Sequence, residues 1–162
     1  VIVYGDAFRV RRQWHDEESG VVSEADDWLA GEAWQHGPLV LSLADIQADL
    51  DDPHAGFNLV AHEIAHKLDM LDGHSDGVPP LPDRQRRQRW LTTFQRAFDA
   101  LRAQVDAGRD TFLDPYAAEA PDEFFAVVSE AFFSCPQALA RAHPDLHGEL
   151  RAFYAIEPWS PA

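Results

Sequence analysis

The sequence predicts an α+β domain in which a small mixed sheet packs on a central helix. Two observations favour this class. Short runs rich in β-branched and aromatic residues lie early in the chain, at residues 1–4, 7–10 and 39–43. Longer segments with apolar residues at helical intervals follow, at residues 59–72, 84–101 and 122–135.

The first part of the chain is expected to form the strands. The first two runs are predicted to be strands joined at Gly5-Asp6, followed by a polar loop over residues 11–27. Residues 28–34 contain two tryptophans and fit a short strand or a turn equally well. After the strand at 39–43, residues 42–50 are expected to begin a helix.

The best-defined element is a helix over residues 59–72. Asn58 is a suitable N-cap, and Gly73 is a suitable residue just beyond the C-terminal end. No proline or glycine interrupts the segment, and its apolar residues recur at helical intervals.

This helix carries the pattern H-E-x-x-H at His62, Glu63 and His66. Helical residues four apart lie on one face with β-carbons about 6 Å apart. Both imidazoles can therefore reach one zinc ion at roughly 2.0–2.1 Å. Glu63 can then take a proton from a zinc-bound water, which makes the pattern typical of metal-dependent peptidases. The alternative is two surface histidines on an amphipathic helix, which the helix signals disfavour.

A catalytic zinc ion usually has three protein ligands, so a third must come from elsewhere in the chain. Asp72 stands where the metzincin pattern has its third histidine, but an uninterrupted helix carries it away from the metal. Asp69, one turn beyond His66, suits a carboxylate that fixes an imidazole; the alternative is a solvated helix acid or a partner of the turn at the C-terminal end of the helix. Glu123 and Glu130 lie seven apart in a later apolar segment and are better candidates. Their positions alone do not choose between them.

The rest of the chain is expected to be mostly helical. A basic run starting at Arg84 continues into a helix with one apolar stripe, so its arginines are expected to form a solvated face. Recruitment of an acidic partner is the alternative for this run. The later elements expected are loops at 74–83 and 106–121, a helix at 122–135 ended by Pro136, and a short helix at 147–154.

Composition limits the classes of function. The 162-residue chain has a formal net charge of −15, which argues against nucleic-acid binding because phosphate contacts need clustered cations. No apolar run approaches the roughly 20 residues that span a bilayer, so no membrane segment is expected. Cys135 is the only cysteine, so no intramolecular disulfide can form. We expect a single domain over residues 1–162 that lacks its native N-terminal segment, because the only methionine is Met70.

Three strings carry a more specific signal than H-E-x-x-H: GPLVLSLADIQADLDDPHAGFNLVAHEIAHKLDMLDG, DGVPPLP and DPYAAEAPDEFFAVVSEAFFSCP. Over residues 34–136 the chain resembles the Mlc titration factor A (MtfA) family of bacterial zinc peptidases. The resemblance implies a zincin-like fold similar to anthrax toxin lethal factor, a gluzincin whose third zinc ligand is a glutamate on a downstream helix. That ligand falls on Glu123, which leaves Glu130 as a supporting acid.

The resemblance also implies roles outside the ligand set. Tyr116, seven residues before Glu123, is then placed to hydrogen-bond the developing oxyanion. Without the resemblance, Tyr116 is equally well explained as a half-buried aromatic residue. The family further implies a cytoplasmic location, activity on short peptides and binding of the glucose repressor Mlc.

The leading hypothesis is therefore a zinc peptidase in which His62, His66 and Glu123 hold Zn²⁺ and Glu63 and Tyr116 act on the peptide substrate. Residues 39–43 are expected to form an edge strand that pairs with the peptide, or a buried structural strand. A second hypothesis is a module that binds and sequesters a transcriptional repressor and whose peptidase activity is weak or dispensable. A structural zinc site is disfavoured, because such sites usually have four ligands rich in cysteine.

Overall fold

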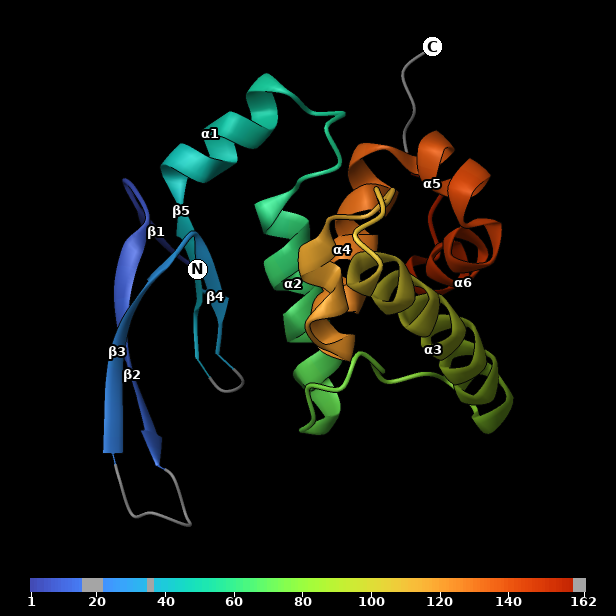
Figure 1. Ribbon diagram of the computed structural model, residues 1–162, viewed down its shortest axis with the longest axis horizontal. Coiled ribbons are helices and arrows are strands. Elements are labelled where there is room, and N and C mark those ends of the chain that lie inside the picture. The colour runs from blue at the N-terminus through green and yellow to red at the C-terminus, as the bar shows by residue number, and fades with distance from the viewer. Residues whose placement is uncertain (16–21, 35–36, 159–162) are drawn as a thin grey trace.

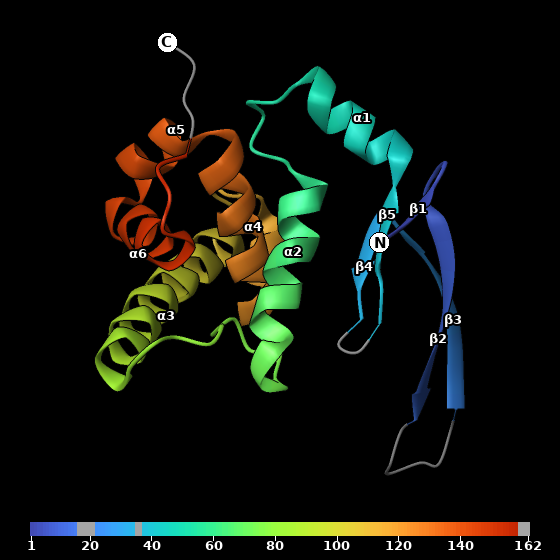
Figure 2. The same ribbon diagram turned by 180° about the vertical axis from the view of Figure 1, so that it is seen from behind.

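The computed structural model describes residues 1–15, 22–34 and 37–158, and only the backbone of residues 9–15 and 22–28. Its architecture is mixed α+β, as predicted. Figure 1 shows the strands on one side, a group of helices on the other, and the helix α2 (Leu59–Asp69) between them. The view from behind gives the same order (Figure 2), and α2 contacts both the sheet and the helix α4 (Pro121–Ser134).

A mixed three-stranded sheet lies beside α2. Its strands are β1 (Ile2–Tyr4), β5 (Leu39–Ser42) and β4 (Gly31–Ala33), in the order β1-β5-β4. The strand β1 runs parallel to β5, and β4 runs antiparallel to it. The strand predicted at 39–43 is thus present, but it is central and buried. Its assignment as an edge strand is wrong, because β4 covers the side nearer to α2.

A second, two-stranded sheet pairs β2 (Phe8–His15) with β3 (Val22–Leu29), in register from Phe8 opposite Leu29 to His15 opposite Val22. The polar loop predicted over 11–27 is therefore wrong at 11–15 and 22–27, and residues 16–21 lie outside the described part. The ladder is made by backbone groups, so a polar sequence does not exclude a strand. The first two predicted strands do not pair with each other but belong to different sheets. The ambiguous segment 28–34 contains the end of β3 and all of β4.

Local sequence explains where the next two helices start and stop. The helix α1 (Leu43–Asp51) begins after Ser42, whose hydroxyl accepts the backbone N–H of Asp45. In α2, the Asn58 side chain accepts the backbone N–H of Ala61 at 2.9 Å. A 3₁₀ turn, η1 (Met70–Asp72), extends α2, and Gly73 ends it at a φ of 95°. The predicted boundaries of this element are confirmed.

The helical side consists of elements that follow α2 in the chain: α3 (Arg84–Asp106), the 3₁₀ turn η2 (Pro115–Ala118), α4, α5 (Pro136–Ala142) and α6 (Pro144–Tyr154). The helix α4 ends at Ser134, just before Pro136, as predicted. Pro136 also begins α5, since the first helical turn does not need the backbone N–H that proline lacks. The helix predicted at 147–154 begins earlier, at Pro144.

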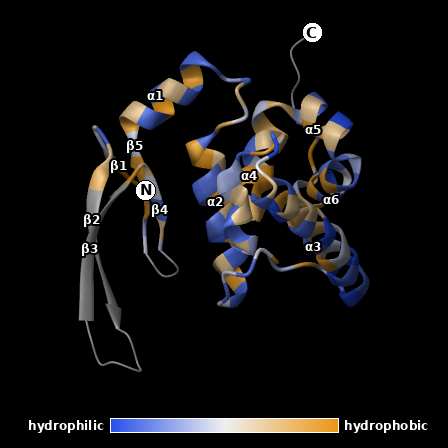
Figure 3. Ribbon diagram, viewed as in Figure 1, coloured by the Kyte–Doolittle hydropathy of each residue, from blue (hydrophilic) through white to orange (hydrophobic). Residues whose placement is uncertain are grey.

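The main core lies among α3, α4 and α6. Trp90 stacks on Phe94 with ring centroids 4.0 Å apart, and Phe125 meets Trp90 edge-on at 5.4 Å. Figure 3 shows the apolar residues gathered along α4. The arginines of α3 that approach α6 face acids: Arg96 binds Asp145 at 2.5 Å, and Arg86 lies 3.9 Å from Glu149. In the described residues, no helix is long and apolar enough to cross a membrane.

The side chain of Lys67 links α2 to the strand side of the molecule. The ammonium of Lys67, on α2, donates to the carbonyl oxygens of Trp34 and Gly37, at 3.0 Å in the case of Gly37. These carbonyls flank the connection between β4 and β5. The link therefore fixes that end of the sheet against α2.

Candidate metal centre

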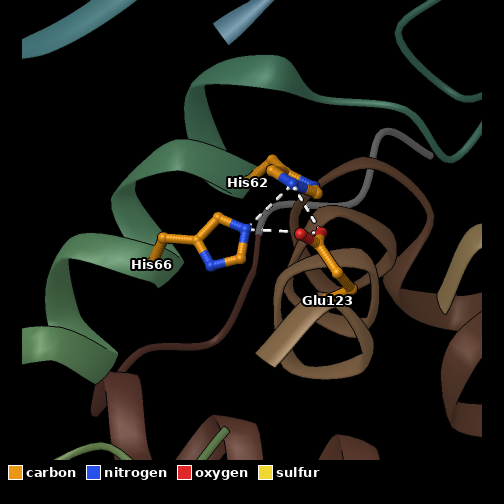
Figure 4. A group of neighbouring side chains, drawn as sticks. All are labelled: His62, His66 and Glu123. Carbon is orange, nitrogen blue, oxygen red and sulfur yellow. Dashed lines mark hydrogen bonds and ion pairs between the residues drawn. The ribbon is translucent and has the colours of Figure 1, made fainter. Parts of the chain in front are cut away.

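His62 and His66 project from α2 toward the first turn of α4, where Glu123 meets them (Figure 4). The Nε2 atoms of the two imidazoles are 3.1 Å apart. Glu123 Oε2 lies 3.3 Å from Nε2 of His62 and 3.4 Å from Nε2 of His66. Among the described residues, these three form the group whose ligand atoms are close enough to hold a metal ion.

The electrostatics of this group call for a positive species between its members. Glu123 Oε2 is buried and has no hydrogen-bond partner among the described residues. Burial alone raises the pKa of Glu123, but the two histidines outweigh burial and hold that pKa well below its usual range. Burial lowers the pKa of His62, because it disfavours the charged imidazole. The carboxylates of Glu123 and Glu130 outweigh burial and raise this pKa to about 10. Two nitrogens and one carboxylate oxygen that converge in this way suit a bound cation.

Glu130 orients the first histidine. Its Oε1 accepts a hydrogen bond from Nδ1 of His62 at 2.7 Å, and its Oε2 accepts the backbone N–H of Asn58 at 2.7 Å. If a metal ion displaces the proton of Nε2, the proton that Glu130 holds on Nδ1 leaves the Nε2 lone pair facing Glu123 and His66. The two acids that the sequence left undistinguished thus occupy opposite sides of one imidazole.

Glu63 lies against β4 and lines the same cavity as His62. The residue is 5% exposed, and its Oε2 has no hydrogen-bond partner among the described residues. Burial raises the pKa of Glu63 to about 7. A β-carbon on Gly31 would overlap the Glu63 carboxylate, so a side chain at this position would force that carboxylate to move. Sequence reasoning missed Gly31, although a glycine between strand-like residues is the available signal.

The two aspartates at the end of the motif helix lie elsewhere. Asp69 is fully buried, and its Oδ2 accepts the backbone N–H of Gly77 at 2.8 Å. Asp69 therefore fixes the loop after α2. Its predicted contact with an imidazole and the alternative of a solvated acid are wrong, whereas the other alternative, a partner of the turn at the C-terminal end of the helix, fits this contact. Asp72 is exposed and accepts the backbone N–H of His74 at 3.2 Å.

Tyr116, on η2, lies at the edge of the group. Its ring centroid is 6.4 Å from that of His62, and the residue is 45% exposed. Burial and the nearby Glu123 carboxylate raise the pKa of its phenol, so this hydroxyl keeps its proton and remains a hydrogen-bond donor.

A cavity of about 420 Å³ adjoins the group on the side of β4 and α1. His62, Glu63 and Tyr116 line one part of it. The candidate centre is therefore open to a ligand from this side.

Comparison with known proteins points to a family. The family described as "Glucose-regulated metallo-peptidase M90" matches residues 1–155. Mlc titration factor A of Yersinia enterocolitica is 40% identical over 161 residues, which cover 98% of this chain and 59% of the relative. The same figures hold for Mlc titration factor A of Pectobacterium atrosepticum. An uncharacterized Synechocystis protein is 43% identical over 159 residues, covering 98% of this chain and 58% of the relative. The chain thus spans under two thirds of the length of these relatives.

Proposed function

The chain belongs to the glucose-regulated metallo-peptidase M90 family, and from this premise we propose that it is a zinc-dependent peptidase. One observation carries the choice of metal. Ligand atoms 2.0–2.1 Å from a tetrahedral zinc ion stand about 3.3 Å apart, because a tetrahedron's edge is about 1.6 times its centre-to-corner distance. The atoms of His62, His66 and Glu123 are 3.1, 3.3 and 3.4 Å apart. Two histidines and one glutamate would hold the ion, which is the number of protein ligands usual for a catalytic zinc ion.

The surrounding residues supply the rest of the chemistry. When bound, zinc supplies a Lewis acid for the scissile carbonyl and for water. Glu63, with its raised pKa, takes the proton of the attacking water and returns it to the leaving amine. The protonated phenol of Tyr116 donates a hydrogen bond to the oxyanion. Glu130 holds His62 in the required tautomer.

The substrate is proposed to lie along β4 rather than along residues 39–43. The strand β4 is at the end of its sheet and borders both α2 and the cavity. An extended peptide can add to such an edge through main-chain hydrogen bonds. The mixed sheet beside α2 and the acid on a second helix also support the zincin-like, gluzincin assignment, and a cytoplasmic location belongs to the same proposal.

The direct test replaces Glu63 with glutamine. Because Glu63 is not a proposed ligand, the Glu63→Gln variant should keep about one zinc ion per chain. Inductively coupled plasma mass spectrometry measures the zinc content. Its rate of peptide hydrolysis should fall about 10³-fold with the loss of the proton acceptor. The exposed Glu157 gives the control Glu157→Gln, which should hydrolyse like the parent. Parent-like hydrolysis by Glu63→Gln would remove Glu63 from the mechanism.

A second candidate function follows from the name of the relatives, Mlc titration factor A. It is the binding and sequestration of a transcriptional repressor of the Mlc type. Glu63→Gln separates the two functions: undiminished repressor binding by the inactive variant means that binding does not need hydrolysis. Loss of binding together with hydrolysis would instead make the repressor a ligand of the catalytic cleft.

A further inference from the structure

The cavity beside the candidate metal centre is strongly acidic. It lies between β4, α1 and the start of α2, and four carboxylates line it: Asp45, Asp49, Glu63 and Glu130. Among the described residues, neither lysine nor arginine lines it. A cleft walled by charges of one sign concentrates ligands of the opposite sign.

The carboxylates are only partly satisfied within the protein. Glu130 uses both oxygens, on His62 and on the backbone of Asn58. Asp49 Oδ2 accepts the backbone N–H of Leu59 at 2.7 Å. By contrast, Glu63 is 95% buried and lines the cavity, and its Oε2 has no hydrogen-bond partner among the described residues. A buried carboxylate oxygen without a donor favours a ligand that brings one.

The acids also oppose one another. The pKa of Asp49 is raised by burial and then by the negative charges of Glu130 and Asp45. A cation placed among these groups relieves that repulsion and regains the hydrogen bonds lost on burial.

Apolar side chains form another part of the wall. Leu29, Phe57 and Leu59 line the cavity together with the acids, and Phe57 is 52% exposed. Lysine and arginine side chains combine a long alkyl stem with a charged end, so they fit a site with apolar walls and an acidic end. A free amino terminus has the charge but not the stem.

We propose that this cavity is the specificity pocket of the peptidase and takes a lysine or arginine side chain of the substrate, next to the bond that is cleaved. Asp45 and Asp49 bind its charged end, and the apolar walls pack on its stem. The inference rests on the proposed function, since it names the substrate class of the same site.

The test uses pairs of fluorogenic peptides that carry arginine or citrulline at one position near the cleaved bond. Citrulline has nearly the same shape as arginine but no charge. The zinc-loaded protein should cleave the arginine peptide with a kcat/KM about tenfold higher at low salt, and the ratio should fall as salt is added. Equal or reversed preference at every position scanned overturns the proposal.

Variants locate the preference. Asp45→Asn combined with Asp49→Asn should bring the arginine-to-citrulline ratio close to one, while the asparagine at 49 can still accept the Leu59 N–H. Asp51→Asn is the matched control, because Asp51 is also on α1 but does not line the cavity, and it should keep the parent ratio. A ratio that the double variant leaves unchanged overturns the proposal.

Two further experiments complete the test. The first separates the charge of a side chain from the charge of a free amino terminus, and the second separates failure of the pocket from failure of the proposed peptidase function. Peptides with acetylated amino termini should keep the full preference, and a preference that follows the free amine overturns the pocket as described. If neither peptide is cleaved, the proposed function fails. The pocket is then decided by binding of both peptides to Glu63→Gln, measured by fluorescence anisotropy. Tighter binding of the arginine peptide supports the pocket, and equal binding overturns it.

Discussion

The two sides of α2 are built differently. On the helical side, ten of the 14 residues of α4 are buried, and aromatic rings of α3, α4 and α6 fill the space between the helices. On the strand side, the described strand that is buried throughout is β5, whereas β1 is exposed along its length. The difference indicates that the helical side provides most of the stability.

The division also separates the proposed tasks. His62 and His66 meet acids from the well-packed α4, so the candidate ligand atoms are held by the stable side. Glu63 faces β4, and the cavity is walled by the strand side and α1. A single helix thus presents its candidate metal ligands to a rigid partner, and its proposed proton acceptor to the wall that is proposed to receive substrate.

The largest expected effect tests whether the helical side provides most of the stability. Phe125 is fully buried among the rings of Trp90, Phe94 and Phe153. Phe125→Ala should lower the free energy of unfolding by about 3–5 kcal/mol, measured by urea denaturation. Val3→Ala, on the 53% exposed strand residue, should cost less than about 1 kcal/mol. Similar losses for both variants would contradict the division.

Asp69, a buried acid at the end of α2, should make the stability of the protein depend on pH. Burial raises the pKa of Asp69 from 3.8 to about 6, despite the hydrogen bond from Gly77. The folded protein therefore holds this proton more tightly than the unfolded chain does. The associated stability is complete below about pH 4 and is lost as pH rises through about 6.

Asp69→Asn removes the charge and keeps an oxygen that can accept the Gly77 N–H. The stability of the variant relative to the parent should increase by on the order of 3 kcal/mol between pH 4 and pH 8, since one pKa unit corresponds to about 1.4 kcal/mol. Urea denaturation of both proteins at several pH values measures this. A difference that stays constant with pH would mean that folding does not raise the pKa of Asp69.

On the strand side, a methyl group should affect catalysis rather than stability. Gly31→Ala places a β-carbon where the Glu63 carboxylate lies, so that carboxylate must move. We expect kcat to fall about 10²-fold, with zinc content and unfolding free energy close to those of the parent. Gly148→Ala is the control, because its β-carbon would meet no atom within 4 Å. Unchanged kcat in Gly31→Ala would show that the contact with β4 does not position Glu63.

Local signals were enough to predict the helix that carries the motif. Its N-cap at Asn58, its end at Gly73 and the spacing of its histidines all depend on neighbouring residues, and the structure agrees with them. The position of Glu123 opposite these histidines depends on how α4 crosses α2, which spacing within one helix cannot give. The resemblance to a family supplied that choice, and the roles of these residues stay predictions.

The predictions that were wrong concern contacts between segments far apart in the sequence. The pairing of β2 with β3 and the place of β4 at the sheet edge depend on backbone contacts between distant segments. For Asp69 the alternative of a turn partner fits and the contact with an imidazole does not, because its partner, Gly77, belongs to a loop whose path helical periodicity does not encode. Sequence patterns predicted an element well where its own residues determine its structure. They predicted less well where contacts with a distant segment determine it.

The bridge made by Lys67 has a practical consequence. Lys67 is the only lysine in the chain, and its ammonium is engaged by the carbonyls at the β4–β5 connection. Acylation at this nitrogen removes its positive charge and leaves those two carbonyls without their ionic donor. An amine-reactive label therefore reports, at one defined side chain, how often the sheet lifts away from its helix.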